Sequence, residues 1–162
     1  MSDASFTRYG FWGQYGYAAA EIGAGDLTSE ADGLRWNGTF KAAHTWAAGE
    51  ASGTNPAGTG SAIWRGIAEA ARTADFEPLM GSAELRIADL TRPRVDADID
   101  LDDGGAGIAL RWTGMEPANG AFGKGTAGAD RIDGRFHGPG HEEAWGTFDT
   151  GAYVGAFGAK RE

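Results

Sequence analysis

A period-two alternation of apolar and polar residues constrains this chain more than any other feature. The segment 95–102 alternates four apolar residues with four aspartates. Successive side chains of a strand point to opposite faces, so the pattern predicts a strand with one buried and one solvated face. The same alternation predicts strands over 34–41, 62–69, 83–87, 108–112 and 131–137, and further strands over 144–149 and 153–160 around a short glycine-containing turn.

Other parts of the chain alternate less clearly. The aromatic, glycine-rich stretch 6–20 predicts one long strand or two short ones. The alanine-rich segments 42–51 and 68–74 lean towards helix, and we expect one short helix at most. The segments 51–60 and 117–128 predict loops, because Gly, Pro, Asn, Ser and Thr dominate them.

These segments predict an all-β fold of eight or nine strands. Short connections favour antiparallel pairing, because parallel strands need long crossovers. Glycine takes 28 of 162 positions, interleaved with 6 Trp, 8 Phe and 4 Tyr. Glycines beside large rings suit a small closed barrel, where they make room for the rings. We therefore expect residues 1–162 to form a single domain, an eight-stranded (eight to nine) antiparallel up-and-down β-barrel, with a two-sheet sandwich as the alternative.

Charge and composition exclude several classes of function. With 14 Lys and Arg against 23 Asp and Glu, the net charge is −9, which argues against a nucleic acid partner. The absence of cysteine excludes disulfides, thiolate metal sites and thiol catalysis. The sequence contains no run of about 18 apolar residues, so it predicts no membrane-spanning helix. Residues 1–8 lack a basic region followed by an apolar stretch, so we expect no signal peptide in this chain.

The densest polar cluster is 137–143. Its two imidazoles, His137 and His141, together with a carboxylate, are metal-ligand types. The glycines and proline between the histidines exclude a regular helix and favour a turn in which Glu142 or Glu143 accepts backbone N–H bonds. We therefore expect a turn and no metal or other cofactor, and His137 and His141 remain the alternative ligand or metal residues.

No arrangement of residues predicts catalysis. His44 stands alone among small and aromatic neighbours, and no nucleophile elbow is visible. We expect a non-enzyme with no catalytic residue, against the alternative of a small hydrolase that uses His137, His141 or Glu143. The aspartates of 95–102 predict a cross-strand charge network with neighbouring arginines and not a calcium loop.

The C-terminal third resembles a known signature. The runs 130–148 and 155–161 are similar to the end of the transferrin-binding-protein-B-like β-barrel domain, G-x-F-Y-G-P-x-A-E-E-x-G-G-x-F followed by G-A-F-G-A-K-R. The segments 60–66 (G-S-A-I-W-R-G) and 8–13 also resemble relatives. His137, His141 and Trp145 depart from the pattern. The matching residues, which the resemblance implies are structural, are Gly134, Phe136, Gly138, Pro139, Glu142, Glu143, Gly146, Phe148, Gly155, Phe157 and Gly158.

The resemblance implies an eight-stranded barrel from a group of bacterial surface or periplasmic proteins, many of them lipoproteins that bind host proteins or haem. It implies a non-enzymatic binding module that contacts a protein or a haem-like ligand through its loops. A structural component of a surface or particle assembly is the alternative. The chain has the length of one barrel, so host-transferrin capture is not implied. A cell-surface, periplasmic or extracellular location follows from the resemblance, and a cytoplasmic or particle-associated one stays open.

Overall fold

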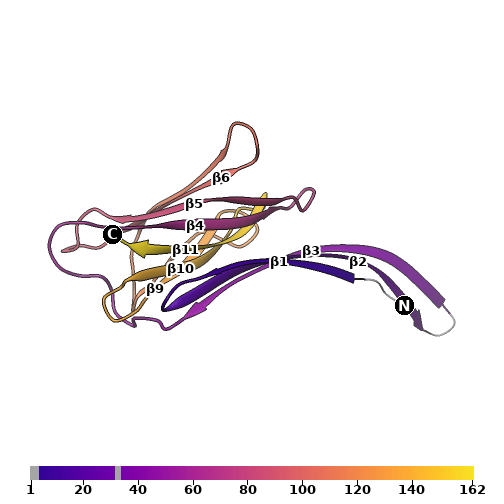
Figure 1. Ribbon diagram of the computed structural model, residues 1–162, viewed down its shortest axis with the longest axis horizontal. Coiled ribbons are helices and arrows are strands. Elements are labelled where there is room, and N and C mark those ends of the chain that lie inside the picture. Colours follow the sequence, from indigo (N-terminus) through magenta and orange to yellow (C-terminus); the bar gives the residue numbers. More distant parts are fainter. Residues whose placement is uncertain (1–3, 32–33) are drawn as a thin grey trace.

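A computed structural model describes residues 4–31 and 34–162, and within these ranges it contains strands and no helix (Figure 1). The first three residues, on which part of the signal-peptide prediction rests, lie outside them. None of the described elements is a helix that could cross a bilayer. The all-β prediction is confirmed. The strands are β1 Ala4–Trp12, β2 Gly16–Ala31, β3 Leu34–Gly49, β4 Ala62–Arg72, β5 Pro78–Ile87, β6 Val95–Asp102, β7 Ile108–Met115, β8 Ala121–Lys124, β9 Arg131–His137, β10 Glu143–Asp149 and β11 Tyr153–Arg161.

Eight strands form a nearly closed antiparallel barrel, in the order β7-β6-β5-β4-β11-β10-β9-β8. Neighbours in the sheet are neighbours in the chain, except that β4 pairs with β11, the last strand. The predicted up-and-down barrel is therefore confirmed. Its remaining gap lies between β7 and β8, where Lys124 Nζ donates to the carbonyl oxygen of Thr113 at 3.0 Å.

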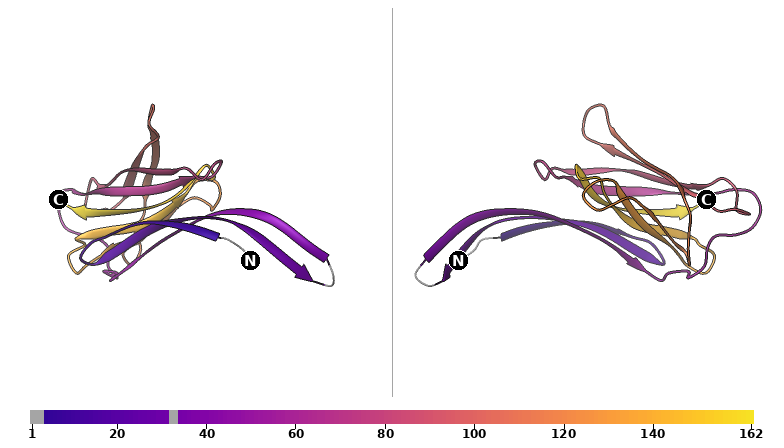
Figure 2. Two further views of the ribbon diagram at one scale, coloured as in Figure 1. Left: turned by 45° about the vertical axis from the view of Figure 1, so that its right-hand side comes forward. Right: turned by 180° about the vertical axis from the view of Figure 1, so that it is seen from behind.

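Strands β1, β2 and β3 form a separate antiparallel sheet, which the sequence did not predict as a unit. The sheet lies across the outside of the barrel, and one end projects well beyond it (Figures 1 and 2). The long β2–β3 hairpin, with 16 residues in each strand, builds this projection. Strand β1 pairs only with the first part of β2.

Several segments were predicted with the wrong secondary structure. The segment 42–51, expected to lean helical, is strand to Gly49, and 68–74 is strand to Arg72. Helix propensity is a weak preference. Ladder pairing with β2 overrides it in 42–49, and ladder pairing together with the burial of Ala68, Ala70 and Ala71 overrides it in 68–72. The loop expected over 117–128 contains β8, and the chain has eleven described strands instead of eight or nine. For 6–20, the two-strand alternative is correct.

The alternation over 95–102 is reproduced in the barrel wall. Its four apolar side chains are buried in the core. On the outer side, Arg111 on β7 forms an ion pair with Asp98 and lies 3.8 Å from Asp100. The predicted cross-strand charge network is confirmed.

Aromatic rings fill the barrel and lie opposite glycines. Phe148 faces Gly155 across the β10–β11 ladder. A Cβ on Gly155 would lie 2.1 Å from the Phe148 Cζ. Phe122 likewise faces Gly134 on β9. The expectation that glycine makes room for rings is confirmed.

Candidate interaction site

Glu143 on β10 fastens the β1–β2 turn to the barrel. Its Oε1 accepts the backbone N–H of Gln14 at 2.7 Å. Its Oε2 accepts the N–H of Tyr15 and the Trp145 indole N–H, both at 2.9 Å. Burial raises the pKa of this carboxyl, but the N–H donors together outweigh burial and hold the pKa below its usual value. The charged carboxylate therefore joins the two sheets.

The turn before β10 is held by local hydrogen bonds. Glu142 Oε2 accepts the N–H of Gly140 at 2.9 Å. The N–H of His141 donates to the carbonyl oxygen of Gly138 at 3.2 Å. Both His141 and Gly138 have positive φ, 58° and 79°. These contacts, with those of Glu143, match the predicted turn whose carboxylates accept backbone N–H groups.

The structure does not bring the two histidines of the cluster together. His137 is buried, and its Nδ1 has no hydrogen-bond partner among the described residues. Burial lowers the pKa of His137, and the Glu50 backbone and the Glu143 carboxylate only partly offset this. The His141 Nε2 instead lies 2.9 Å from the carbonyl oxygen of Thr54. Within 4–31 and 34–162, no three His, Asp or Glu side chains are grouped to hold a metal.

The remaining signature residues lie in the barrel strands β9, β10 and β11 or in the turn before β10. Gly134, Gly146, Gly155 and Gly158 lie opposite or beside rings. Phe136, Phe148 and Phe157 fill the core. Pro139 lies exposed in the turn. These are positions that build the barrel, and none of these side chains reaches the projecting part of the three-stranded sheet.

The face of the three-stranded sheet that points away from the barrel is aromatic. Neighbouring residues of β1 lie on opposite faces of the sheet. Phe11 stacks on Trp145 of the barrel, with 5.6 Å between the ring centres, whereas Trp12 is 81% exposed. Phe6 and Tyr17 are 59% and 47% exposed. We call this surface the outer aromatic face; by strand alternation its described members are Phe6, Arg8, Trp12, Tyr17, Glu21, Phe40, His44 and Trp46.

Charged groups on the outer aromatic face are paired with each other or lie over rings. Arg8 forms an ion pair with Glu21 at 3.1 Å, and its guanidinium lies 5.2 Å from the ring centre of Trp46. The ring of His44 lies 5.4 Å from that of Trp46. An open hollow of about 640 Å³ lies at the barrel end of β1, β2 and β3, lined among others by Arg8, Trp12 and Trp46. The sequence showed these aromatics, but not which of them lie on this face.

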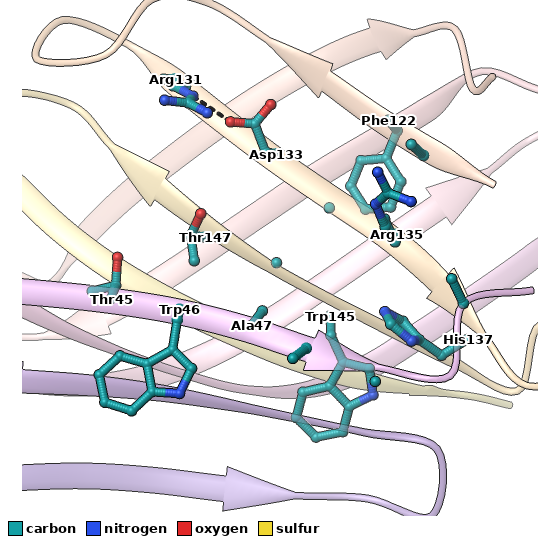
Figure 3. Close-up of a pocket in the computed structure, with 16 residues that line it drawn as sticks. Thr45, Trp46, Ala47, Phe122, Arg131, Asp133, Arg135, His137, Trp145 and Thr147 are labelled. Atoms are coloured by element: carbon teal, nitrogen blue, oxygen red, sulfur yellow. Dashed lines mark hydrogen bonds and ion pairs between the residues drawn. The ribbon is translucent and has the colours of Figure 1, made fainter. Parts of the chain in front are cut away.

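A second hollow runs between β3 and the barrel wall (Figure 3). Its volume is about 680 Å³, and it lies between β3 on one side and β9 and β10 on the other. Arg135, His137 and Thr147 are among the residues that line it. Of the predicted candidate ligands, His137 lines this hollow and His141 does not. Sequence reasoning missed it, because its two sides come from different sheets.

Comparison with known proteins gives structural similarities only. No family model matches the chain, and no curated protein matches it. The intact transferrin-binding protein B named Ap-TbpB, with N and C lobes, is 16% identical over 96% of this chain and 38% of its own, with a TM-score of 0.49. The isotype 1 protein from serogroup B Neisseria meningitidis is 15% identical over 95% of this chain and 35% of its own, with a TM-score of 0.49. A double mutant from Haemophilus parasuis is 14% identical over 96% of this chain and 37% of its own, with a TM-score of 0.47. The chain thus spans less than two fifths of each of these proteins.

Proposed function

We propose that this chain is a non-enzymatic binding module of a bacterial surface or periplasmic protein, and that it binds a protein partner through the outer aromatic face. The observation that carries the proposal is the exposure of Trp12, at 81%, beside the exposed rings of Phe6 and Tyr17. Exposed apolar patches of this kind mark interaction sites. Trp, Tyr and Arg are the residue types most enriched among binding hot spots.

The shape and charge of the outer aromatic face suit a protein. The face is an open sheet surface, with a hollow that a partner side chain can enter. The ion pair of Arg8 and Glu21 places polar groups among the rings, so a partner meets both apolar and polar contacts. Interfaces combine such an aromatic centre with polar surroundings.

Preorganisation supports the same function. Glu143 holds the β1–β2 turn, and Phe11 stacks on Trp145 of the barrel. These contacts fix the sheet before a partner arrives, which lowers the entropy cost of binding. We therefore treat residues 1–162 as one module, in which the barrel presents the sheet. The bacterial surface location rests on the resemblance of the C-terminal signature.

The test compares a double variant with a matched control. Trp12→Ser with Tyr17→Ser removes the exposed rings. Ile67→Ser with Met80→Ser, at residues that are 42% and 55% exposed on the barrel, removes two exposed apolar side chains elsewhere. Each immobilised protein captures partners from a bacterial or host extract, and quantitative mass spectrometry compares them. We expect a protein that wild type and control retain equally and that the Trp12/Tyr17 variant loses by about tenfold or more.

Two further measurements separate the alternatives. If every captured protein is retained equally by the Trp12/Tyr17 variant, the proposal is wrong. Sedimentation velocity of the purified chain tests the assembly alternative, which predicts self-association that the same variant abolishes. Titration with haemin tests the haem-like ligand, which predicts a shifted Soret band. Self-association that the variant abolishes would favour the assembly alternative over the proposed protein partner. A shifted Soret band would favour a haem-like ligand.

A further inference from the structure

Strand β3 has one edge that pairs with no other strand in the described part of the chain, since its ladder is with β2. Five consecutive residues of β3, 45–49, line the hollow of Figure 3. Consecutive side chains of a strand point to opposite faces, so only the strand edge can border a space along five residues in a row. The hollow is therefore a groove along the backbone N–H and C=O groups of β3.

The groove begins at a point where the β3 chain and β9 touch. After β3, Ala51 forms an isolated antiparallel bridge with His137. The Ser52 N–H donates to the Phe136 carbonyl oxygen at 2.9 Å, and the Gly138 N–H donates to the Glu50 carbonyl oxygen at 3.1 Å. Before this point the two strands separate. Strand β9 is already paired with β8 on one edge and with β10 on the other. It therefore contributes side chains to the groove wall but no free backbone edge.

The groove is long enough for an extended segment. A second hollow of about 310 Å³ shares Thr45, Arg131 and Thr147 with the first and reaches Ala43. Together they follow β3 from residue 43 to residue 49. Seven residues of strand span about 23 Å.

One cationic side chain on the groove wall has no partner among the described residues. Arg135 makes no ion pair or side-chain hydrogen bond with any described residue, whereas Arg131 is paired with Asp133. Both Asp149 oxygens accept backbone N–H groups, from Gly128 and Gly151, at 2.7 and 2.8 Å.

Other polar groups of the groove are also without protein partners. Thr45 and Thr147 lie on opposite sides of the gap (Figure 3), and neither hydroxyl bonds to a described residue. At the narrow end, the buried Nδ1 of His137 is unpartnered in the same way, beside Gly49. The backbone edge of β3 continues along the far end as far as residue 43. A ligand with hydrogen-bonding groups along its length and one negative charge complements this wall.

We infer that the groove binds an extended segment of a partner protein, which adds to β3 as a further strand and places a carboxylate side chain opposite Arg135. In strand addition, main-chain hydrogen bonds supply affinity and alternate side chains supply specificity. This site lies along the edge of the sheet and is separate from the outer aromatic face. It stands whether or not that face binds a protein.

The test uses a blocked, fluorescent seven-residue peptide of alternating valine and glutamate, with fluorescence anisotropy as the readout. We expect the peptide to bind the full chain, and a lysine counterpart to bind at least about tenfold more weakly. Arg135→Glu should weaken binding by a similar factor. Arg92→Glu, which makes the same charge change on an exposed turn, should not. Circular dichroism confirms that both variants fold.

Backbone methylation separates strand addition from charge attraction alone. Two isomers of the peptide carry N-methyl groups on alternate amides. In an added strand, every second N–H group of the peptide points towards β3 and the others point away from it. The isomer whose methyl groups block the N–H groups that face β3 should therefore lose affinity by about tenfold or more. The other isomer should keep its affinity. No binding of the glutamate peptide, equal binding by Arg135→Glu, or equal behaviour of the two isomers would each overturn the proposal.

Discussion

Gly146 and Phe157 face each other across the β10–β11 ladder, and the ring occupies the space that a side chain at position 146 would need. A Cβ on Gly146 would lie 2.5 Å from the Phe157 Cζ and 2.3 Å from the backbone oxygen of Asp133. The ring can rotate slightly, but the backbone oxygen belongs to the paired strand β9. Glycine is therefore required here by close approach on two sides.

Gly146→Ala should destabilise the barrel by about 1–3 kcal/mol, the usual cost of overpacking a core. Urea unfolding followed by tryptophan fluorescence measures the change. The control is Gly105→Ala, where the nearest atom to a new Cβ, Asp103 Oδ1, is 3.4 Å away. It should stay within about 1 kcal/mol of wild type. Equal stability of the two variants would contradict the close approach at Gly146.

Glu143→Gln should weaken the hydrogen bonds that hold the β1–β2 turn against the barrel. The substitution replaces one of the two carboxylate oxygens with an N–H₂ group, so the backbone N–H of Gln14 or that of Tyr15 loses its acceptor. The expected loss of unfolding free energy at neutral pH is about 1–3 kcal/mol. Glu142→Gln, at a half-buried carboxylate with one local bond, is the control and should cost less.

The Glu143 effect should also depend on pH in a defined direction. The folded-state pKa of this carboxyl is lowered, so its stabilisation is fully present above the unfolded value of about 4.3. It is lost as the pH falls through the folded value. The stability difference between wild type and Glu143→Gln should therefore shrink only below about pH 4. A difference that is constant down to complete acid unfolding would show that the charge is not responsible.

The contribution of Glu69 on β4 to stability should depend on pH in the opposite direction to that of Glu143. The Glu69 side chain is buried, and its Oε2 has no hydrogen-bond partner among the described residues. Burial raises its pKa. The folded state then binds the proton more tightly, so stability is greatest below the unfolded value of about 4.3 and falls as the pH rises through the folded value.

Glu69→Gln should therefore be more stable than wild type at neutral pH, by on the order of 1 kcal/mol. The two stability curves should converge below about pH 4, again near the unfolded value. Thermal unfolding across a pH series measures this, with Glu77→Gln at an exposed position as the control. If Glu69→Gln is less stable at every pH, the carboxylate has a stabilising contact and this prediction is wrong.

Trp12→Ser should leave the fold as stable as wild type, within about 0.5 kcal/mol, because the ring buries little surface. Trp145→Ala should cost about 3–5 kcal/mol, since that ring is buried under Phe11. Differential scanning calorimetry distinguishes the two. A large loss for Trp12→Ser would mean that the ring belongs to the core and would remove the basis of the proposed interaction face.

Barrel strands such as β6 were predictable because they bury one face only. The alternation over 95–102 marks the buried side directly, since every second residue meets either core or water. The strand over 42–49 escaped prediction because alanine occupies both of its faces, and a run of alanines has no period. Strand β8 escaped because it is only four residues long, among glycines.

The candidate site was only partly predictable. A turn in which Glu143 accepts backbone N–H groups follows from local sequence, but its partners Gln14 and Tyr15 lie more than a hundred residues away. Phe11 and Trp12 are adjacent aromatics with opposite roles, which only the position of the barrel decides. The position of Arg135 on the hollow beside the β3 edge depends on how one sheet crosses another. No local pattern encodes that crossing.

The ladder between β4 and β11 has a consequence for how the chain reaches its fold. It pairs residues as distant as Trp64 and Arg161, so joining the two halves of the eight-stranded sheet requires contacts of very long sequence separation. Folding slows as such non-local contacts increase. On a ribosome, β4 has to wait for β11 to be translated, with its edge open in the meantime. A chaperone that shields strand edges should therefore raise the yield of folded protein during synthesis more than it raises the stability of the finished barrel.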